Sequence, residues 1–165
     1  MAYTDILTKL RVLAQQNSTL QADLGATQPP PAVPFRWFDR QLQPGIVAKQ
    51  AAGGTCVAAI RVSTIRNANM GGIMNLEAAK VQFTVYDLDS AIAASVANDV
   101  VEFMGTVDLC SLNQFGSPVT PISQNPNFLL DQRQRSVPNP QSPSGPVYTE
   151  ELDFRIYNRT DLVIS

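Results

Sequence analysis

Residues 76–103, LEAAKVQFTVYDLDSAIAASVANDVVEF, decide the fold. The apolar residues of the first half lie at alternate positions: Ala79, Val81, Phe83 and Val85. Alternation of this kind predicts a β-strand over 76–86 with one face in the core. The apolar residues of the second half have helical spacing: Ile92, Val96, Val100 and Phe103. We therefore predict a helix over residues 91–104, capped by Ser90 and ended by Gly105.

The segment before this stretch supplies a partner strand. Residues 56–66 also alternate, and the Asn- and Gly-rich residues 67–72 suit a turn, so 56–66 and 76–86 are predicted to form a hairpin. Residues 5–24 have apolar side chains at helical spacing between a cap at Thr4 and Gly25, which predicts one helix. Residues 35–38, FRWF, predict a short aromatic strand or extended segment.

A second hairpin is predicted from residues 128–135 and 147–158, which both alternate. In the second of these strands, Leu152, Phe154 and Ile156 are expected to face the core. Residues 26–34, 111–127 and 136–146 are proline-rich and are predicted to be loops of a single domain spanning 1–165. The expected fold class is α+β: an antiparallel sheet built of two hairpins, with two helices packed on one face.

The composition excludes several kinds of chemistry. The chain has no histidine, which excludes His-based catalytic triads and His-ligated zinc or iron. Cys56 and Cys110 are far apart and are expected to be buried free thiols, and we expect no cofactor and no bound metal. The net charge of -2 is too balanced for a module that binds DNA through phosphate contacts. Only 16% of residues are charged, which favours a protein that packs against copies of itself.

Two pairs of carboxylates are candidate sites. Asp87 and Asp89 could hold a divalent cation, but Ala91 and Ile92 stand where an EF-hand loop needs an oxygen ligand and a glycine. Acids that favour the positive end of a helix are the preferred interpretation. Glu151 and Asp153 share one face of a strand, which is predicted to be solvated or interfacial rather than a paired-carboxylate site.

A charged strand face is the candidate functional surface. It comprises Arg133, Arg135, Glu151, Asp153 and Arg155. Ion pairing across strands or subunits is favoured over contact with DNA phosphates. Because the opposite face must cover the helices, we expect this face to point outward, between subunits or toward a central channel. Exchange of Asp153 for Lys is therefore expected to leave the stability of the isolated subunit nearly unchanged.

No signal peptide and no membrane span are expected, because the start MAYTD lacks a basic and an apolar region and no apolar stretch is long enough. A cytosolic, reducing location follows.

The order of elements resembles that of a known family. An amphipathic helix is followed by PFRWF (34–38), by a hairpin strand (79–87) that leads straight into a helix (91–103), and by a closing strand with LDFRI (152–156). This pattern is similar, over most of the chain, to the tail terminator or tail completion proteins of long-tailed bacteriophages. The resemblance implies a structural virion protein without catalysis, forming a hexameric ring that caps the tail tube at its head-proximal end.

The resemblance also implies the partners. They would be further copies of the chain, the tail tube protein and a head-side connector or stopper protein, with DNA only as passing cargo and no membrane. The protein would be assembled in the host cytoplasm and located in the virion tail. A head-to-tail connector or stopper ring is the alternative within this class. A small carboxylate-dependent hydrolase using Asp87, Asp89, Glu151 or Asp153 is the alternative from another class.

Overall fold

A computed structural model of the chain describes residues 5–25, 34–66, 76–109, 127–138 and 146–159. These residues form an α+β fold in which four helices pack on a five-stranded sheet, so the predicted α+β class is confirmed. The predicted cap Thr4, the turn at 67–72, Cys110 and most of the predicted loops at 26–34, 111–127 and 136–146 lie outside the described residues. That residues 1–165 form a single domain stays a prediction.

The sheet contains both predicted hairpins. Its strands are β1 (Trp37–Phe38), β2 (Cys56–Arg66), β3 (Leu76–Asp87), β4 (Phe128–Val137) and β5 (Val147–Arg159), in the spatial order β1-β2-β3-β5-β4. The hairpins β2–β3 and β4–β5 are antiparallel, and an antiparallel pairing of β3 with β5 joins them.

The sheet is mixed, so the purely antiparallel sheet predicted from the sequence is wrong. The exception is β1, which pairs in parallel with β2. Two backbone hydrogen bonds of Arg36 hold this segment in place. The N–H of Arg36 donates to the carbonyl of Leu24 at 2.9 Å, and the carbonyl of Arg36 accepts from the N–H of Val57 at 3.0 Å. The aromatic segment is thereby held against the edge of β2.

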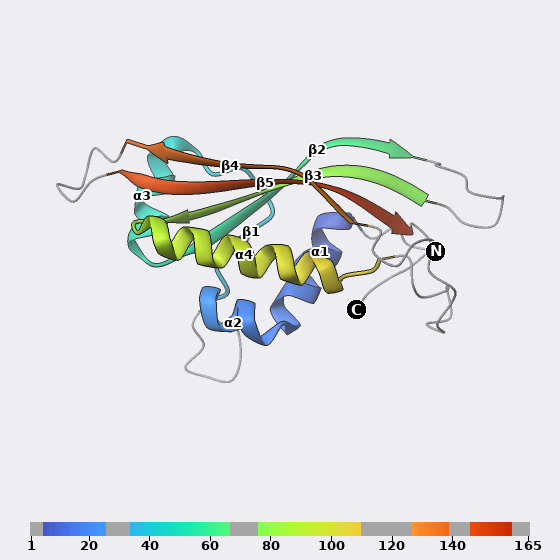
Figure 1. Ribbon diagram of the computed structural model, residues 1–165, viewed down its shortest axis with the longest axis horizontal. Coiled ribbons are helices and arrows are strands. Elements are labelled where there is room, and N and C mark those ends of the chain that lie inside the picture. Colours follow the sequence, from blue (N-terminus) through green and yellow to red (C-terminus); the bar gives the residue numbers. More distant parts are fainter. Residues whose placement is uncertain (1–4, 26–33, 67–75, 110–126, 139–145, 160–165) are drawn as a thin grey trace.

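Three helices lie on one face of the sheet: α1 (Ile6–Gln16), α2 (Ser18–Leu24) and α4 (Ser90–Thr106) (Figure 1). The single helix predicted over 5–24 is wrong, because it breaks at Asn17, whose backbone is extended (φ -84, ψ 120). The side chain of Asn17 accepts from the N–H of Leu20 and so caps α2. The cap of α1 is Asp5, whose side chain accepts from the N–H of Leu7.

The helix predicted over 91–104 is present as α4, with different ends. Its cap is Asp89 rather than Ser90, and it continues past Gly105 to Thr106. Ile92, expected on the buried stripe, is 47% exposed. The buried stripe of α4 is instead formed by Ala93, Val96, Ala97, Val100, Phe103 and Met104.

A fourth helix, α3 (Pro44–Ala52), packs on the opposite face of the sheet, at one end (Figure 1). The prediction of two helices on a single face is therefore wrong. The helix begins at a proline, which suits the first turn, and buries Val47 and Ala51 against Cys56 and Tyr86. Two buried residues one turn apart are too short a pattern to predict a helix from the sequence.

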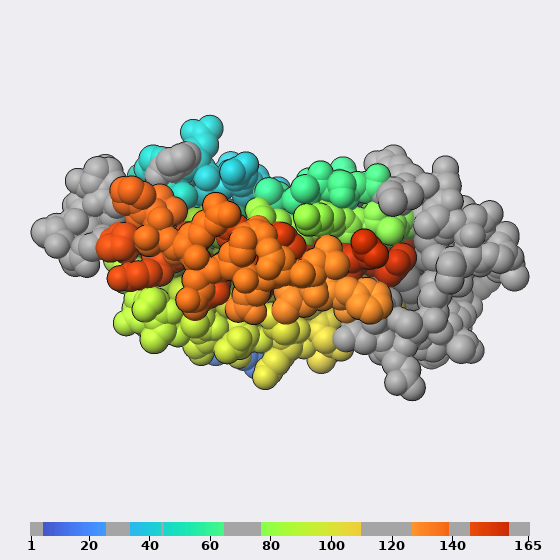
Figure 2. Space-filling view, turned by 45° about the horizontal axis from the view of Figure 1, so that its top comes forward, coloured from blue at the N-terminus to red at the C-terminus, as the bar shows by residue number. Residues whose placement is uncertain are grey.

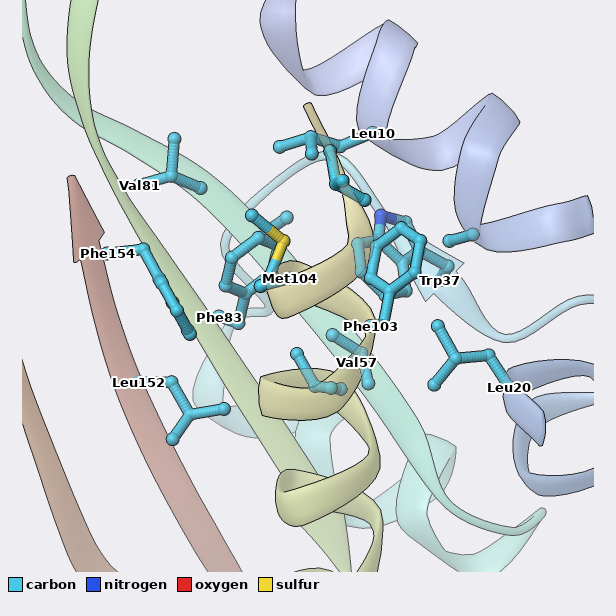
Figure 3. Close-up of a cluster of buried hydrophobic side chains, with 14 of the residues drawn as sticks. Leu10, Leu20, Trp37, Val57, Val81, Phe83, Phe103, Met104, Leu152 and Phe154 are labelled. Atoms are coloured by element: carbon cyan, nitrogen blue, oxygen red, sulfur yellow. The ribbon is translucent and has the colours of Figure 1, made fainter. Parts of the chain in front are cut away.

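The main core lies between the sheet and helices α1, α2 and α4 (Figure 3). Trp37 packs edge-on against Phe83 and Phe103, with ring centroids 5.6 and 6.4 Å apart. Phe83 packs edge-on against Phe154 at 5.7 Å. The predicted core positions of β3 and β5 are buried, which confirms the alternation that defined these strands. Their other faces consequently point away from α4.

Candidate functional site

The charged face of the sheet lies opposite α4, on β4 and β5. Because Leu152 and Phe154 are buried toward the helices, the alternate residues Glu151 and Asp153 lie on the other face. β4 places Arg133 opposite Glu151 and Asp131 opposite Asp153. The structure thus brings together four of the five residues predicted for this face, Arg133, Arg135, Glu151 and Asp153.

Arg133 is the centre of an ion cluster. Its Nε and Nη2 donate to Glu151 Oε2 at 3.1 and 3.0 Å, and its Nη1 donates to Asp153 Oδ2 at 3.0 Å. Nη1 also donates to Asp131 on its own strand. The pKa of Arg133 is raised by these hydrogen bonds, most by the one with Glu151 and less by those with Asp131 and Asp153. Cross-strand ion pairing, the interpretation favoured from the sequence, is confirmed within the chain.

Asp153 lies deeper than the sequence indicated. Its residue surface is 4% exposed, and besides Arg133 it accepts from Gln82 Nε2 at 3.0 Å. A carboxylate in this position is an internal partner of the sheet, so the expectation of a freely outward-facing Asp153 is wrong. Arg135 is attached more loosely, with Nε 3.7 Å from Glu151 Oε1 and 61% of its side chain exposed.

Arg155 is not part of the cluster around Arg133. It is exposed and lies with Lys80 beside a hollow of about 280 Å³. Other residues lining this hollow are Ser63, Leu130 and Tyr157. The charged face therefore has three carboxylates around Arg133 and, next to them, a basic region with Lys80 and Arg155, in which Lys80 Nζ lies 4.0 Å from Asp153 Oδ2.

The N-terminal end of β4 carries an exposed apolar run. Phe128, Leu129 and Leu130 are 51, 41 and 46% exposed, on a strand at the edge of the sheet. The pairing with β5 shifts between Leu129 and Asp131, so that Leu130 is the extra residue of a β-bulge. Leu129 consequently lies opposite the buried Phe154, whereas Asp131, two residues on, lies opposite Asp153 on the other face of the sheet.

This apolar run was missed from the sequence, although FLL directly before the alternating DQRQR gave a signal. Figure 2 shows β4, in orange, along the front of the molecule with no other coloured element over it. Exposed apolar residues on an edge strand mark an interaction surface, because unpaired N–H and C=O groups lie beside them. We call β4 with its apolar run the β4 edge.

The β4 edge is anchored on both faces of the sheet. On the helix side, Gln132 and Gln134 both donate to Glu150, which is 2% exposed. On the other side, Arg133 binds Glu151 and Asp153. Polar contacts on both faces hold this strand in a fixed geometry.

A second polar cluster, inside the fold, was also missed from the sequence. Lys9 of α1 donates from Nζ to Asn158 Oδ1 at 2.8 Å, and Asn158 Nδ2 donates to Glu77 Oε1 at 3.2 Å. All three residues are 0% exposed. The cluster joins α1 to β3 and β5 and lies away from the charged face, so its role is structural.

The other candidate carboxylates are engaged locally. Asp89 accepts from the N–H groups of Ala91 and Ile92 at 2.8 and 3.2 Å, which confirms its helix-start role. Asp87 accepts from the N–H of Asp89 at 2.8 Å and from the hydroxyl of Thr55. Within the described ranges, no group of three or more Cys, Asp or Glu side chains is placed to hold a metal ion. Among the helices described, none has the length and apolar character to cross a membrane.

Burial raises the pKa of the Cys56 thiol to about 11, so this free cysteine is a poor nucleophile.

Comparison with protein families and with curated proteins finds no match for this chain.

Proposed function

We propose that this chain is a structural virion protein that forms a ring at the head-proximal end of a phage tail, as a tail terminator or tail completion protein. In this role it ends growth of the tail tube and joins the tail to the head. The observation that carries the proposal is the β4 edge, with three consecutive exposed apolar residues, Phe128 to Leu130, on a strand whose outer side has no partner strand in the described part of the chain.

An edge of this kind favours a subunit of an assembly. Edge strands of solitary proteins are protected by charges, prolines or covering segments, because a free edge pairs with other chains. The N-terminal end of the β4 edge has apolar side chains where such protection would stand. Burying them against another chain removes apolar surface from water, at about 25 cal/mol per Å².

The charged face suits a ring through which DNA passes. Arg133 is surrounded by three carboxylates, so its guanidinium is already paired within the chain. Dense positive charge would hold the phosphates and slow their transit. DNA is on this proposal a passing cargo rather than a bound ligand.

The carboxylates that a hydrolase would use are occupied in structural contacts. Glu151 and Asp153 bind Arg133, and Asp89 caps α4. A general acid or a nucleophile must be free to reach a substrate. This engagement favours the assembly protein over the carboxylate-dependent hydrolase.

The test is the mass of the purified full chain under native conditions, together with its binding to tail tubes of the phage that encodes it. We expect a ring, or binding to one end of the tube, and no hydrolysis of nucleic acid or polysaccharide with Mg²⁺ present. Binding to isolated head connectors without tubes would favour the stopper. A strictly monomeric protein at high micromolar concentration that binds neither would contradict the proposal.

A further inference from the structure

We propose that the β4 edge of one copy docks antiparallel against the β2 edge of the next copy, with Leu130 of one chain meeting Val62 of the other. This inference rests on the proposed function in one respect, that the chain assembles with itself. It adds the two surfaces that meet, the direction of the strands and the head-to-tail character of the contact.

The first observation is that the sheet has a free edge on each side within the described residues. On one side, β4 pairs only with β5. On the other side, β1 pairs only with Val57 and Ala58, at the start of β2. The rest of β2, residues 60–66, pairs with β3 on one side and has no strand on its outer side in the described part of the chain. We call this segment the β2 edge.

The second observation is that each edge carries a bulge with an exposed apolar residue. The pairing of β2 with β3 shifts between Arg61 and Ser63, and the extra residue, Val62, is 52% exposed. On β4 the extra residue, Leu130, is 46% exposed. A bulge changes the direction in which a side chain points. A charged residue at that position would protect the edge from pairing with another strand. Both edges present an apolar residue instead.

The third observation is that the two bulges lie at nearly the same height of the sheet. One continuous line of paired residues crosses four strands: Arg61, Val81, Phe154 and Leu129. Val62 directly follows Arg61, and Leu130 directly follows Leu129. Because β2 and β4 run in opposite directions, Val62 and Leu130 lie on opposite sides of this line. A copy placed beside the first without a shift along the strands therefore brings the two bulges to within about one residue step, or about 3.3 Å, of each other.

The fourth observation is the direction of the strands. β2 and β5 run one way, and β3 and β4 run the other way, because each neighbouring pair among them is antiparallel. A second copy in the same orientation places its β2 antiparallel to the β4 of the first. The sheet can thus continue from chain to chain with regular hydrogen bonding.

These observations identify a second copy of the chain as the occupant. The two bulges lie at nearly the same height of the sheet, their strands run in opposite directions, and each bulge carries an exposed apolar residue. Both contact regions belong to one chain. Different surfaces meet in such a contact, so it is heterologous, and it closes into a ring when the rotation between copies is a whole fraction of a turn. A symmetric dimer through two β4 edges, or capture of a foreign strand, are outcomes that the test separates.

The test uses two variants of the full chain, Val62→Lys and Leu130→Lys, because a lysine on an edge strand opposes pairing. Each variant loses one edge and keeps the other. Each alone is expected to be monomeric in native mass measurement. Mixed in equal amounts, they are expected to form a 1:1 heterodimer and nothing larger, through the intact β4 of Val62→Lys and the intact β2 of Leu130→Lys. The heterodimer itself shows that both variants are folded.

Ile92→Lys is the matched control. Ile92 is 47% exposed on α4, away from both edges, so this variant adds the same charge and is expected to assemble like the wild type. Should a lysine variant fail to fold by circular dichroism, Val62→Gln and Leu130→Gln replace it in the same mixing experiment.

The outcomes separate this inference from the proposed function. Assembly of the wild type and of both lysine variants would overturn the edge contact and leave the proposed function standing. Assembly of Val62→Lys alone, with Leu130→Lys monomeric, would show that β4 meets another surface and would also overturn it. A wild-type chain that neither assembles nor binds tail tubes would overturn the proposed function.

Discussion

Replacing Lys9 by Met should destabilise the protein strongly. Lys9 is fully buried, and a hydrogen bond to Asn158 connects it to the buried carboxylate of Glu77. Lysine can only donate hydrogen bonds and a carboxylate can only accept them, so the amide of Asn158 has one orientation that serves both. Each member of the cluster therefore depends on the other two.

The size of the effect follows from the burial. Met fills nearly the same volume as Lys, so packing changes little, but the buried Asn158 Oδ1 loses the donor Lys9 Nζ and the cluster loses a positive charge. Removal of one partner from a buried hydrogen bond costs about 1–3 kcal/mol, and more where the group is charged. A domain has a free energy of unfolding of about 5–15 kcal/mol, so this loss is a large part of the total.

Urea unfolding followed by circular dichroism measures the change. We expect the midpoint to fall with an unchanged slope, since the surface exposed on unfolding is the same. Lys49→Met, at an exposed position of α3, is the matched control and should change the free energy of unfolding by less than about 0.5 kcal/mol. The variant with Lys9→Met, Asn158→Leu and Glu77→Leu together should recover part of the loss, because it leaves no buried charge. A change below about 1 kcal/mol for Lys9→Met alone would refute the reasoning.

Three further predictions concern single side chains. Burial, and to a smaller extent the hydrogen bond and charge of Asp99, raise the pKa of Asp23 from 3.8 to about 6. The folded state therefore keeps a proton that the unfolded chain releases, and the stability of the protein falls as the pH rises through this window. Asp23→Asn should therefore gain most in Tm above pH 6 and progressively less toward pH 4, and a gain independent of pH would count against the assignment. In a Cys110→Ser protein, Cys56 should react with Ellman's reagent only after unfolding, because burial raises the pKa of its thiol to about 11; rapid reaction of the folded protein would disprove this. Asp153→Ala should cost about 1–3 kcal/mol in urea unfolding, because it removes the acceptor of Gln82 Nε2 and one of the three carboxylates that bind Arg133. Arg135→Ala should cost less than about 0.5 kcal/mol, and equal costs would be inconsistent with the buried position of Asp153.

The strands that alternate over many residues could be predicted from the sequence. In β3 and β5, one face must be apolar to cover the helices, and residues such as Phe83 and Phe154 report this directly. The short or long-range features could not be predicted. Asn17 interrupts an otherwise continuous helical pattern, and β1 acquires its direction only from contacts with segments distant along the chain.

The candidate site was predictable as a face but not as a set of contacts. Alternation places Arg133 and Glu151 on outward faces of two strands, yet only the register puts them opposite each other. The register depends in turn on the bulge at Leu130, which shifts the pairing by one residue. Burial of Asp153 depends on Gln82 of a third strand, which no local pattern connects to it.

The position of β5 governs when the β4 edge can form during synthesis. β5 is the last described strand along the chain, but it lies between β3 and β4 in the sheet. Until β5 has left the ribosome, β4 has no neighbour, and Glu150, Glu151 and Asp153, which hold the two glutamines and Arg133, have not been made. An unfinished chain therefore cannot present a formed β4 edge, and any contact through this edge must follow the synthesis of β5.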